Sequence, residues 1–250
     1  MLNALRVVLV EPSHPGNIGA VARSMWTMGL TRLVLVKPKI FPSAEATARA
    51  AGADELLYRA RVCDDLASAI EGCGYVTATT ARKRRLELPV LTPREWGGRF
   101  AEQAVRTEAA LVFGRESSGL NNGEIDLCHA LAKIPANEAY ASLNLASAVQ
   151  LFAYEARQAW LGAGGEQPAL DGEASQDRPA TADELAGFYE HLEQTLVQIG
   201  YLDPENPKLL MRRLRRLFGR TQIEQPEVNI LRGILAVTQR VARGGRKGEG

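Results

Sequence analysis

The sequence contains few cysteines, few aromatic residues and no long apolar run. Its three cysteines, Cys63, Cys73 and Cys128, are widely spaced and odd in number, which excludes a disulfide framework and offers no metal-ligand spacing. No apolar stretch approaches the ~18 residues that a membrane-spanning helix needs. Near the start, the six residues LRVVLV hold one Arg among apolar side chains and are followed by turn residues, which predicts a strand rather than a secretory signal. We therefore expect a cytoplasmic protein without a bound metal.

The composition is typical of a folded protein, but the charge is unevenly distributed. Of 250 residues, 46% are hydrophobic and 24% are charged, so the chain can form one large domain or two small ones. Residues 206–250 hold eleven Lys and Arg against three Glu, a net charge of +8. The preceding residues hold nineteen basic and twenty-six acidic side chains, a net charge of −7. This asymmetry predicts a separate basic module with an anionic partner.

Short strands alternate with helical patterns over the first 160 residues. Helical patterns cover Asn17 to Met28 and Leu143 to Leu161. A capping box at Thr92 indicates the start of another helix. Buried strands are expected at 5–10, 33–36, 75–80, 110–114 and 131–134. Such alternation predicts an α/β domain over residues 1–161, with a mostly parallel sheet covered by helices on both faces.

The second part of the chain has a different pattern. Residues 162–180 are rich in Gly, Pro and acidic side chains, which predicts a flexible linker. A second capping box begins at Thr181 and opens a run of three predicted helices. We expect a helical, basic extension over residues 181–243 and a disordered tail over residues 244–250.

The first candidate site is the segment E-P-S-H-P-G-N-I-G-A-V-A-R, which follows a strand and opens a helix. Ligands of open α/β sheets bind beyond the carboxyl ends of strands, and helix N-termini favour anions. Pro15, Gly16 and Gly19 permit close approach of a backbone, and Arg23 lies one and a half turns into the helix. The alternative is a plain strand–helix turn with a surface Arg.

Two further motifs also follow predicted strands. L-V-F-G-R-E-S-S-G-L begins at Leu111 and runs from a buried strand into a charged pair, which could be a structural salt bridge instead of a site. The loop from Ile134 leads into the long helix, with Ser142 as the expected N-cap. Asn144 would then lie in the first turn and could reach a ligand, unless this loop serves capping alone.

A basic run, Arg82-Lys83-Arg84-Arg85, follows the strand that ends at Thr80. It would lie at the same edge of the sheet as the other motifs, so we favour phosphate binding over a solvated loop. The three histidines form no H-E-x-x-H pattern, and no nucleophile elbow is present, which leaves metal hydrolase and acyl-transfer functions without residues to support them. A dinucleotide oxidoreductase is excluded because no Gly-rich turn follows the first strand.

Together the motifs resemble those of the knotted SPOUT methyltransferases, in the branch that methylates ribose 2′-hydroxyls of RNA. The matching patterns are N-x-G-x-x-x-R from Asn17, F-G-x-E-x-x-G-L from Phe113 and S-L-N-L-A-x-A from Ser142. The resemblance covers residues 1–161. The basic helical extension is also similar to members that act on ribose 32 of the tRNA anticodon loop.

The resemblance implies a deep trefoil knot in the C-terminal part of the sheet domain, a homodimer with its active site at the interface, and S-adenosylmethionine as cofactor. It implies that Arg23 is catalytic and acts near the partner subunit's cofactor, with Asn17, Glu116, Ser142 and Asn144 in the same site. The implied cofactor-binding residues are Thr79, Thr80, Ala81, Gly114, Arg115, Glu116, Ile134, Ser142, Leu143 and Asn144.

The expected RNA-binding residues combine the sheet edge with the basic extension. Six cations within thirteen residues of the extension have no acid among them, and they should repel one another unless an anion is near. The complete set is His14, Arg23, Arg82, Lys83, Arg84, Arg115, Lys208, Arg212, Arg213, Arg215, Arg216 and Arg220.

Methyl transfer to a ribose oxygen needs an aligned nucleophile and no metal. Because a guanidinium is effectively always protonated, two roles stay open for Arg23. It could lose its proton in a crowded basic site, or it could stay charged, clamp a phosphate and stabilise developing alkoxide charge. Asn17 could orient the hydroxyl or Arg23, and Glu116 is expected to anchor a loop.

The sequence thus predicts a tRNA ribose methyltransferase acting at nucleotide 32, on cytidine or uridine. The first alternative is a ribosomal RNA ribose methyltransferase. The second is an RNA-binding protein without activity on the same scaffold, and the intact motif residues argue against it.

Overall fold

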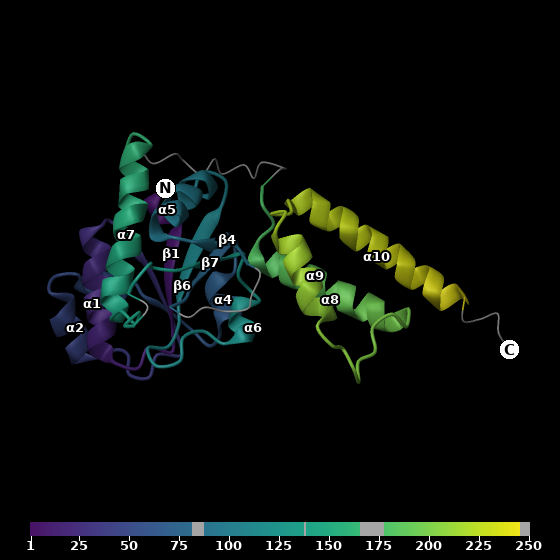
Figure 1. The fold of residues 1–250 in the computed structure, drawn as a ribbon, viewed down its shortest axis with the longest axis horizontal. Helices are drawn as coiled ribbons and strands as arrows, with labels where there is room; N and C mark the ends of the chain where they lie inside the picture. Colours follow the sequence, from purple (N-terminus) through teal and green to yellow (C-terminus); the bar gives the residue numbers. More distant parts are fainter. Residues whose placement is uncertain (82–87, 138, 166–177, 246–250) are drawn as a thin grey trace.

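A computed structural model describes residues 1–81, 88–137, 139–165 and 178–245 (Figure 1). The basic run at 82–85, most of the expected linker and the end of the expected tail lie outside these ranges. Within them, no helix is both long enough and apolar enough to cross a membrane.

The first part of the chain forms one seven-stranded sheet in the order β3-β2-β1-β6-β4-β7-β5, and all the paired strands are parallel. This confirms the predicted α/β fold. Five strands match the sequence pattern, whereas β3 and β5 are too short and too exposed to give an apolar run. The strands are β1 (Leu5–Val10), β2 (Arg32–Val36), β3 (Arg61–Cys63), β4 (Cys73–Thr79), β5 (Val90–Leu91), β6 (Glu108–Phe113) and β7 (Ala130–Ala132).

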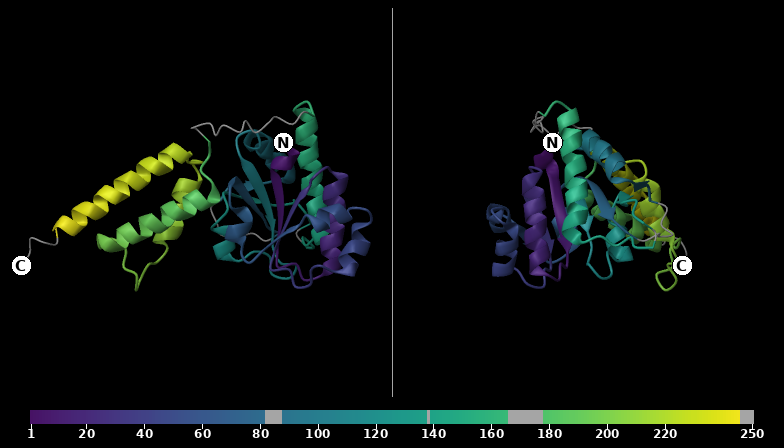
Figure 2. Two further views of the ribbon diagram at one scale, coloured as in Figure 1. Left: turned by 180° about the vertical axis from the view of Figure 1, so that it is seen from behind. Right: turned by 60° about the vertical axis from the view of Figure 1, so that its left-hand side comes forward.

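Helices cover both faces of the sheet, as seen in Figures 1 and 2. All six residues of β1 are buried because α1, α5 and α7 pack on one face and α4 and α6 on the other. These helices are α1 (Pro15–Thr27), α4 (Leu66–Ile70), α5 (Pro93–Gln103), α6 (Asn122–Ile125) and α7 (Leu145–Gly162), with the short η1 (Leu2–Ala4), α2 (Ala44–Ala50) and α3 (Asp54–Tyr58) beside them.

Local signals explain where several helices begin. At α5, the Thr92 Oγ1 accepts from the Glu95 amide at 3.3 Å, and the Glu95 carboxylate accepts from the Thr92 amide at 2.7 Å. This is the capping box that the sequence indicated, with Pro93 in the first turn. At α6, Asn121 and Glu124 form the same reciprocal pair.

The C-terminal helices have a small core of their own. They are α8 (Ala182–Gln198), α9 (Leu210–Gly219) and α10 (Gln225–Gly245), and they lie beside the sheet domain (Figure 1). Phe188 is fully buried among them, and Phe218 packs edge-on against it. Contacts such as the Arg212–Asp126 ion pair join them to the sheet domain.

Candidate active site

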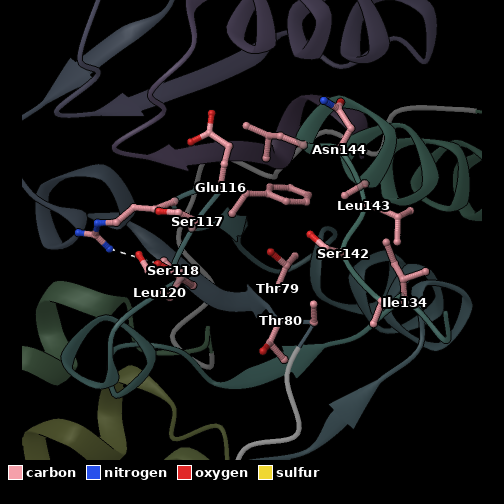
Figure 3. Close-up of a pocket in the computed structure, with 18 of the residues that line it drawn as sticks. Thr79, Thr80, Glu116, Ser117, Ser118, Leu120, Ile134, Ser142, Leu143 and Asn144 are labelled. Carbon is pink, nitrogen blue, oxygen red and sulfur yellow. Dashed lines mark hydrogen bonds between the residues drawn. The ribbon is translucent and has the colours of Figure 1, made fainter. Parts of the chain in front are cut away.

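Four loops meet at one edge of the sheet and enclose a cavity of about 750 Å³ (Figure 3). They follow β1, β6, β4 and β7, which are consecutive neighbours in the sheet. Since parallel strands share a carboxyl edge, motifs that are far apart in sequence come together there. The cavity lining includes all ten expected cofactor residues: Thr79, Thr80, Ala81, Gly114, Arg115, Glu116, Ile134, Ser142, Leu143 and Asn144.

The cavity suits a nucleoside joined to an amino acid. Apolar side chains on its wall, among them Ile134, Leu143 and Phe113, could contact a flat base. Threonine and serine hydroxyls, at Thr79 and Ser142 for example, face it as well and could bind polar ends. A volume of about 750 Å³ lies within the usual range for ligands of this size. The residues present therefore fit S-adenosylmethionine.

A glycine is required where β6 ends. A Cβ on Gly114 would lie 2.3 Å from the Gly119 carbonyl carbon and 2.4 Å from the Leu120 nitrogen, so no side chain can be accommodated. The loop folds back tightly here, with a bridge between Arg115 and Gly119. This close backbone contact accounts for the Gly in the second motif.

The Glu116 carboxylate is held by the first motif. Ser13 donates to it from its amide, at 3.1 Å to Oε2, and from its hydroxyl, at 3.0 Å, while Asn17 Nδ2 donates to Oε1 at 3.1 Å. Burial raises the pKa of Glu116, but these hydrogen bonds outweigh that effect and lower the pKa overall. Glu116 is thus an ionised anchor that ties the β6 loop to the start of α1, as expected.

Asn17 also links the first motif to the third. Asn144 Nδ2 donates to Asn17 Oδ1 at 3.2 Å, and Asn144 Oδ1 accepts from the Ala146 amide at 2.9 Å. Asn144 is therefore the N-cap of α7, and the expectation that Ser142 caps this helix is wrong. Because α7 begins at Leu145, Ser142 stays in the loop and lines the cavity.

Arg115 lies within a charge network rather than free at the edge of the cavity. Its guanidinium forms ion pairs with Glu11 and with Glu124, the latter at 2.9 Å. These two carboxylates raise the pKa of Arg115. Arg115 is therefore paired with two carboxylates of the described structure, and its expected contact with RNA stays a prediction.

Arg23 does not reach the cavity of its own chain. It lines a separate hollow between α1, α2 and α7 and is exposed. The glycine in front of it has a packing role, since a Cβ on Gly19 would lie 2.0 Å from the Ala46 carbonyl oxygen. The backbone that approaches α1 at this point is thus that of α2. His14, by contrast, is exposed at the cavity.

Some residues of the site were not singled out from the sequence. Ser13 holds Glu116, Ser117 and Ser118 line the cavity, and Tyr140 does so with 82% of its surface exposed. The two serines lie inside the second motif, next to the charged pair. That position could have identified them as candidate cavity residues from the sequence. Tyr140 lies in a polar loop with no periodic pattern.

The basic residues of α9 and its flanks fall into two groups. Arg212 pairs with Asp126 at 2.9 Å, Arg215 stacks over the Tyr189 ring at 4.5 Å, and Arg216 is half-buried. These three face the protein. The exposed cations are Lys208, Arg213 and Arg220, and none of them forms an ion pair with another described residue.

Comparison with known proteins identifies the family. The model of the SpoU rRNA Methylase family matches residues 4–154, and that of the tRNA methyltransferase TrmJ C-terminal domain matches residues 183–247. The chain belongs to the SpoU methylase family. The second match places this SpoU protein with the TrmJ group, and residues 155–182 lie between the two matches.

Curated relatives of this SpoU family chain match it over nearly its whole length. It is 51% identical to the tRNA (cytidine/uridine/adenosine-2′-O-)-methyltransferase TrmJ of Pseudomonas aeruginosa, over 98% of this chain and 97% of the relative. It is 48% identical to the tRNA (cytidine/uridine-2′-O-)-methyltransferase TrmJ of Klebsiella pneumoniae, over 98% and 100%.

Solved structures agree with the fold. The crystal structure of TrmJ from Z. mobilis superposes with a TM-score of 0.79 at 35% identity, covering 93% of this chain and 97% of that one. A second structure, described as concerning the 2-OH methylation of C/U34 on tRNA, gives a TM-score of 0.52 at 29% identity, over 63% and 97%.

Proposed function

We propose that this protein transfers a methyl group from S-adenosylmethionine to a ribose 2′-hydroxyl of tRNA, at nucleotide 32 of the anticodon loop. The observation that supports this most is near-full-length similarity to tRNA 2′-O-methyltransferases, combined with a cavity lined by all ten expected cofactor residues. The trefoil knot of the family is expected around this cavity.

The residues of the cavity position the reactants. When bound, S-adenosylmethionine supplies an electrophilic methyl group on a sulfonium. Hydrogen bonds among Glu116, Asn17 and Asn144 fix the three loops relative to one another. In this proposal, most of the rate enhancement comes from holding the ribose oxygen in line with the methyl group. Glu116 is unsuited to proton donation because its carboxylate is ionised and already accepts three hydrogen bonds.

Arg23 acts as a charged clamp in this proposal. A guanidinium in contact with water stays protonated, so it binds phosphate and stabilises developing negative charge on the ribose oxygen rather than acting as a base. Because Arg23 lies outside the cavity of its own chain, it serves the active site of a second copy in this proposal.

We therefore propose a homodimer in which α1 and α7 form the interface. These helices pack side by side and expose Trp26, Leu151 and Tyr154, which are 48%, 41% and 45% exposed. Burying such side chains against a second copy would stabilise the dimer and bring Arg23 to the partner's cavity. Light scattering checks this, because an active species near 27.2 kDa would contradict it.

The deciding experiment identifies the methylated nucleoside. Unmethylated tRNA is incubated with the protein and labelled cofactor, digested and analysed by mass spectrometry. We expect 2′-O-methylcytidine and 2′-O-methyluridine that map to nucleotide 32. Base methylation would refute the proposal, and label at nucleotide 34 would refute the position. Label only in ribosomal RNA would favour the first alternative, and an absence of product in both RNAs would favour a non-catalytic RNA-binding protein.

A further inference from the structure

Arg23 shares its surface hollow with a second arginine, Arg49 of α2. No carboxylate is found among the described residues that line the hollow, and neither arginine forms an ion pair with another described residue. Two uncompensated guanidinium groups in one hollow favour the binding of an anion. The other lining residues are small, polar or aliphatic: Ala20, Ser24, Ala146, Ser147, Gln150 and Leu151.

The packing of α2 on α1 brings the two arginines together. A Cβ on Gly19 would lie 2.9 Å from the Arg49 Cβ, so the stem of Arg49 lies directly against α1 at this glycine. Arg23 follows Gly19 by four residues and lies on the same face of α1, one turn further on. Replacing Gly19 by a larger residue would push α2 and Arg49 away.

The nearest acid on α2 lies beside the stem of Arg49 but forms no ion pair with its guanidinium. Glu45 precedes Arg49 by one turn, but its Oε1 lies over Gly16, 2.7 Å from where a Cβ would stand. No ion pair joins Glu45 to Arg49 in the described structure. The positive charge at the hollow therefore stays available to a ligand.

We propose that Arg23 and Arg49 together bind one backbone phosphate of the RNA substrate, next to the ribose that is methylated. This inference rests on the proposed function. A phosphodiester fits better than a base, since two guanidinium forks and the Ser147 hydroxyl offer donors, and no aromatic ring among the described residues lines the hollow for stacking. Arg49 is a positioning residue, because it holds the strand and does not touch the reacting atoms.

The test compares Arg49→Ala and Arg49→Glu with wild type and with Arg59→Ala. Arg59 is a matched control at the C-cap of α3, exposed and paired with Glu55 at 2.6 Å. Binding of unmodified tRNA transcripts is measured over a range of NaCl concentrations. We expect Arg49→Ala to weaken binding about tenfold and to reduce the log–log salt slope by about one unit, and Arg49→Glu to weaken binding further. Cofactor affinity should stay close to wild type, the KM for tRNA should rise by more than kcat falls, and Arg59→Ala should match wild type throughout.

A double-mutant cycle tests whether the two arginines share one phosphate. If they do, the loss of tRNA affinity in Arg23→Ala/Arg49→Ala should be clearly smaller than the product of the two single losses. An Arg49→Ala protein with wild-type affinity and salt slope, or a double variant with fully multiplicative losses, would overturn the inference. A wild type that binds tRNA without methylating ribose would instead overturn the proposed function, and the binding comparison would still decide the role of Arg49.

Discussion

At the scale of single residues, Arg23 gives the sharpest test of the chemistry. Arg23→Ala should lower kcat by about 100-fold or more, because it removes stabilisation of charge on the ribose oxygen. Cofactor binding measured by calorimetry should be close to wild type, since Arg23 is not one of the ten expected cofactor residues that line the cavity. Arg23→Lys should fail as well, because an ammonium offers a point charge in place of a planar fork. Near-normal turnover in either variant would remove Arg23 from the reaction.

His129 gives a prediction about stability and pH. The Val76 amide donates to its Nδ1 at 2.9 Å, and the ring stacks on Tyr75. Burial lowers the pKa of His129 from 6.5 to about 4, and Nδ1 must be unprotonated to accept from the Val76 amide. The folded state therefore keeps the ring neutral at pH values where the unfolded chain would bind a proton.

The stability that comes from neutral His129 should be complete above about pH 6.5 and should be lost as the pH falls toward about 4. In His129→Asn the amide can still accept from Val76, but it does not titrate. The advantage of wild type over this variant should shrink by on the order of 2 kcal/mol between pH 7 and pH 4, from the pKa shift with some allowance for exposure. Urea midpoints of both proteins at several pH values measure this difference in stability. A difference that does not change with pH would show that protonation of His129 does not affect stability.

At the scale of elements, the arginines of α9 and its C-cap fall into two groups, one that contacts the protein and one that is exposed to solvent. Its inward arginines contact Asp126 and Tyr189, whereas Arg213 and Arg220 face solvent. Charges that are already paired contribute less to RNA binding, so the two faces should respond differently to mutation.

Arg213→Gln/Arg220→Gln should weaken tRNA binding and reduce the log–log salt slope by about two units, with an unchanged urea midpoint. The matched variant Arg212→Gln breaks the pair with Asp126. It should cost about 0.5 kcal/mol of stability and change the salt slope little. Equal salt slopes for the double variant and for Arg212→Gln would show that exposed and protein-facing arginines contribute alike to RNA binding.

At the scale of the whole molecule, the sheet domain and the helical extension should be separable. A chain that ends at Gly164 retains the complete cavity and the α1 and α7 surfaces, so it should fold, dimerise and bind cofactor. It lacks the exposed cations of α9 and should bind tRNA far more weakly, with a shallower salt dependence. Calorimetry, light scattering and filter binding test the three parts. Unchanged tRNA affinity would mean that the extension serves packing alone.

Local interactions made much of this protein predictable from its sequence. Capping at Thr92 and the apolar strand runs depend on residues close together in the chain, so the α/β fold could be inferred from them. The residues that line the cavity were implied by the resemblance of the three motifs to a known family. Contacts between distant segments decided the rest. The strand order brings four loops to one edge, the Asn17–Asn144 hydrogen bond joins the first motif to the third, and the approach of α2 at Gly19 brings Arg49 beside Arg23. No local pattern carries that information, because each of these contacts depends on which surfaces pack together once the chain has folded.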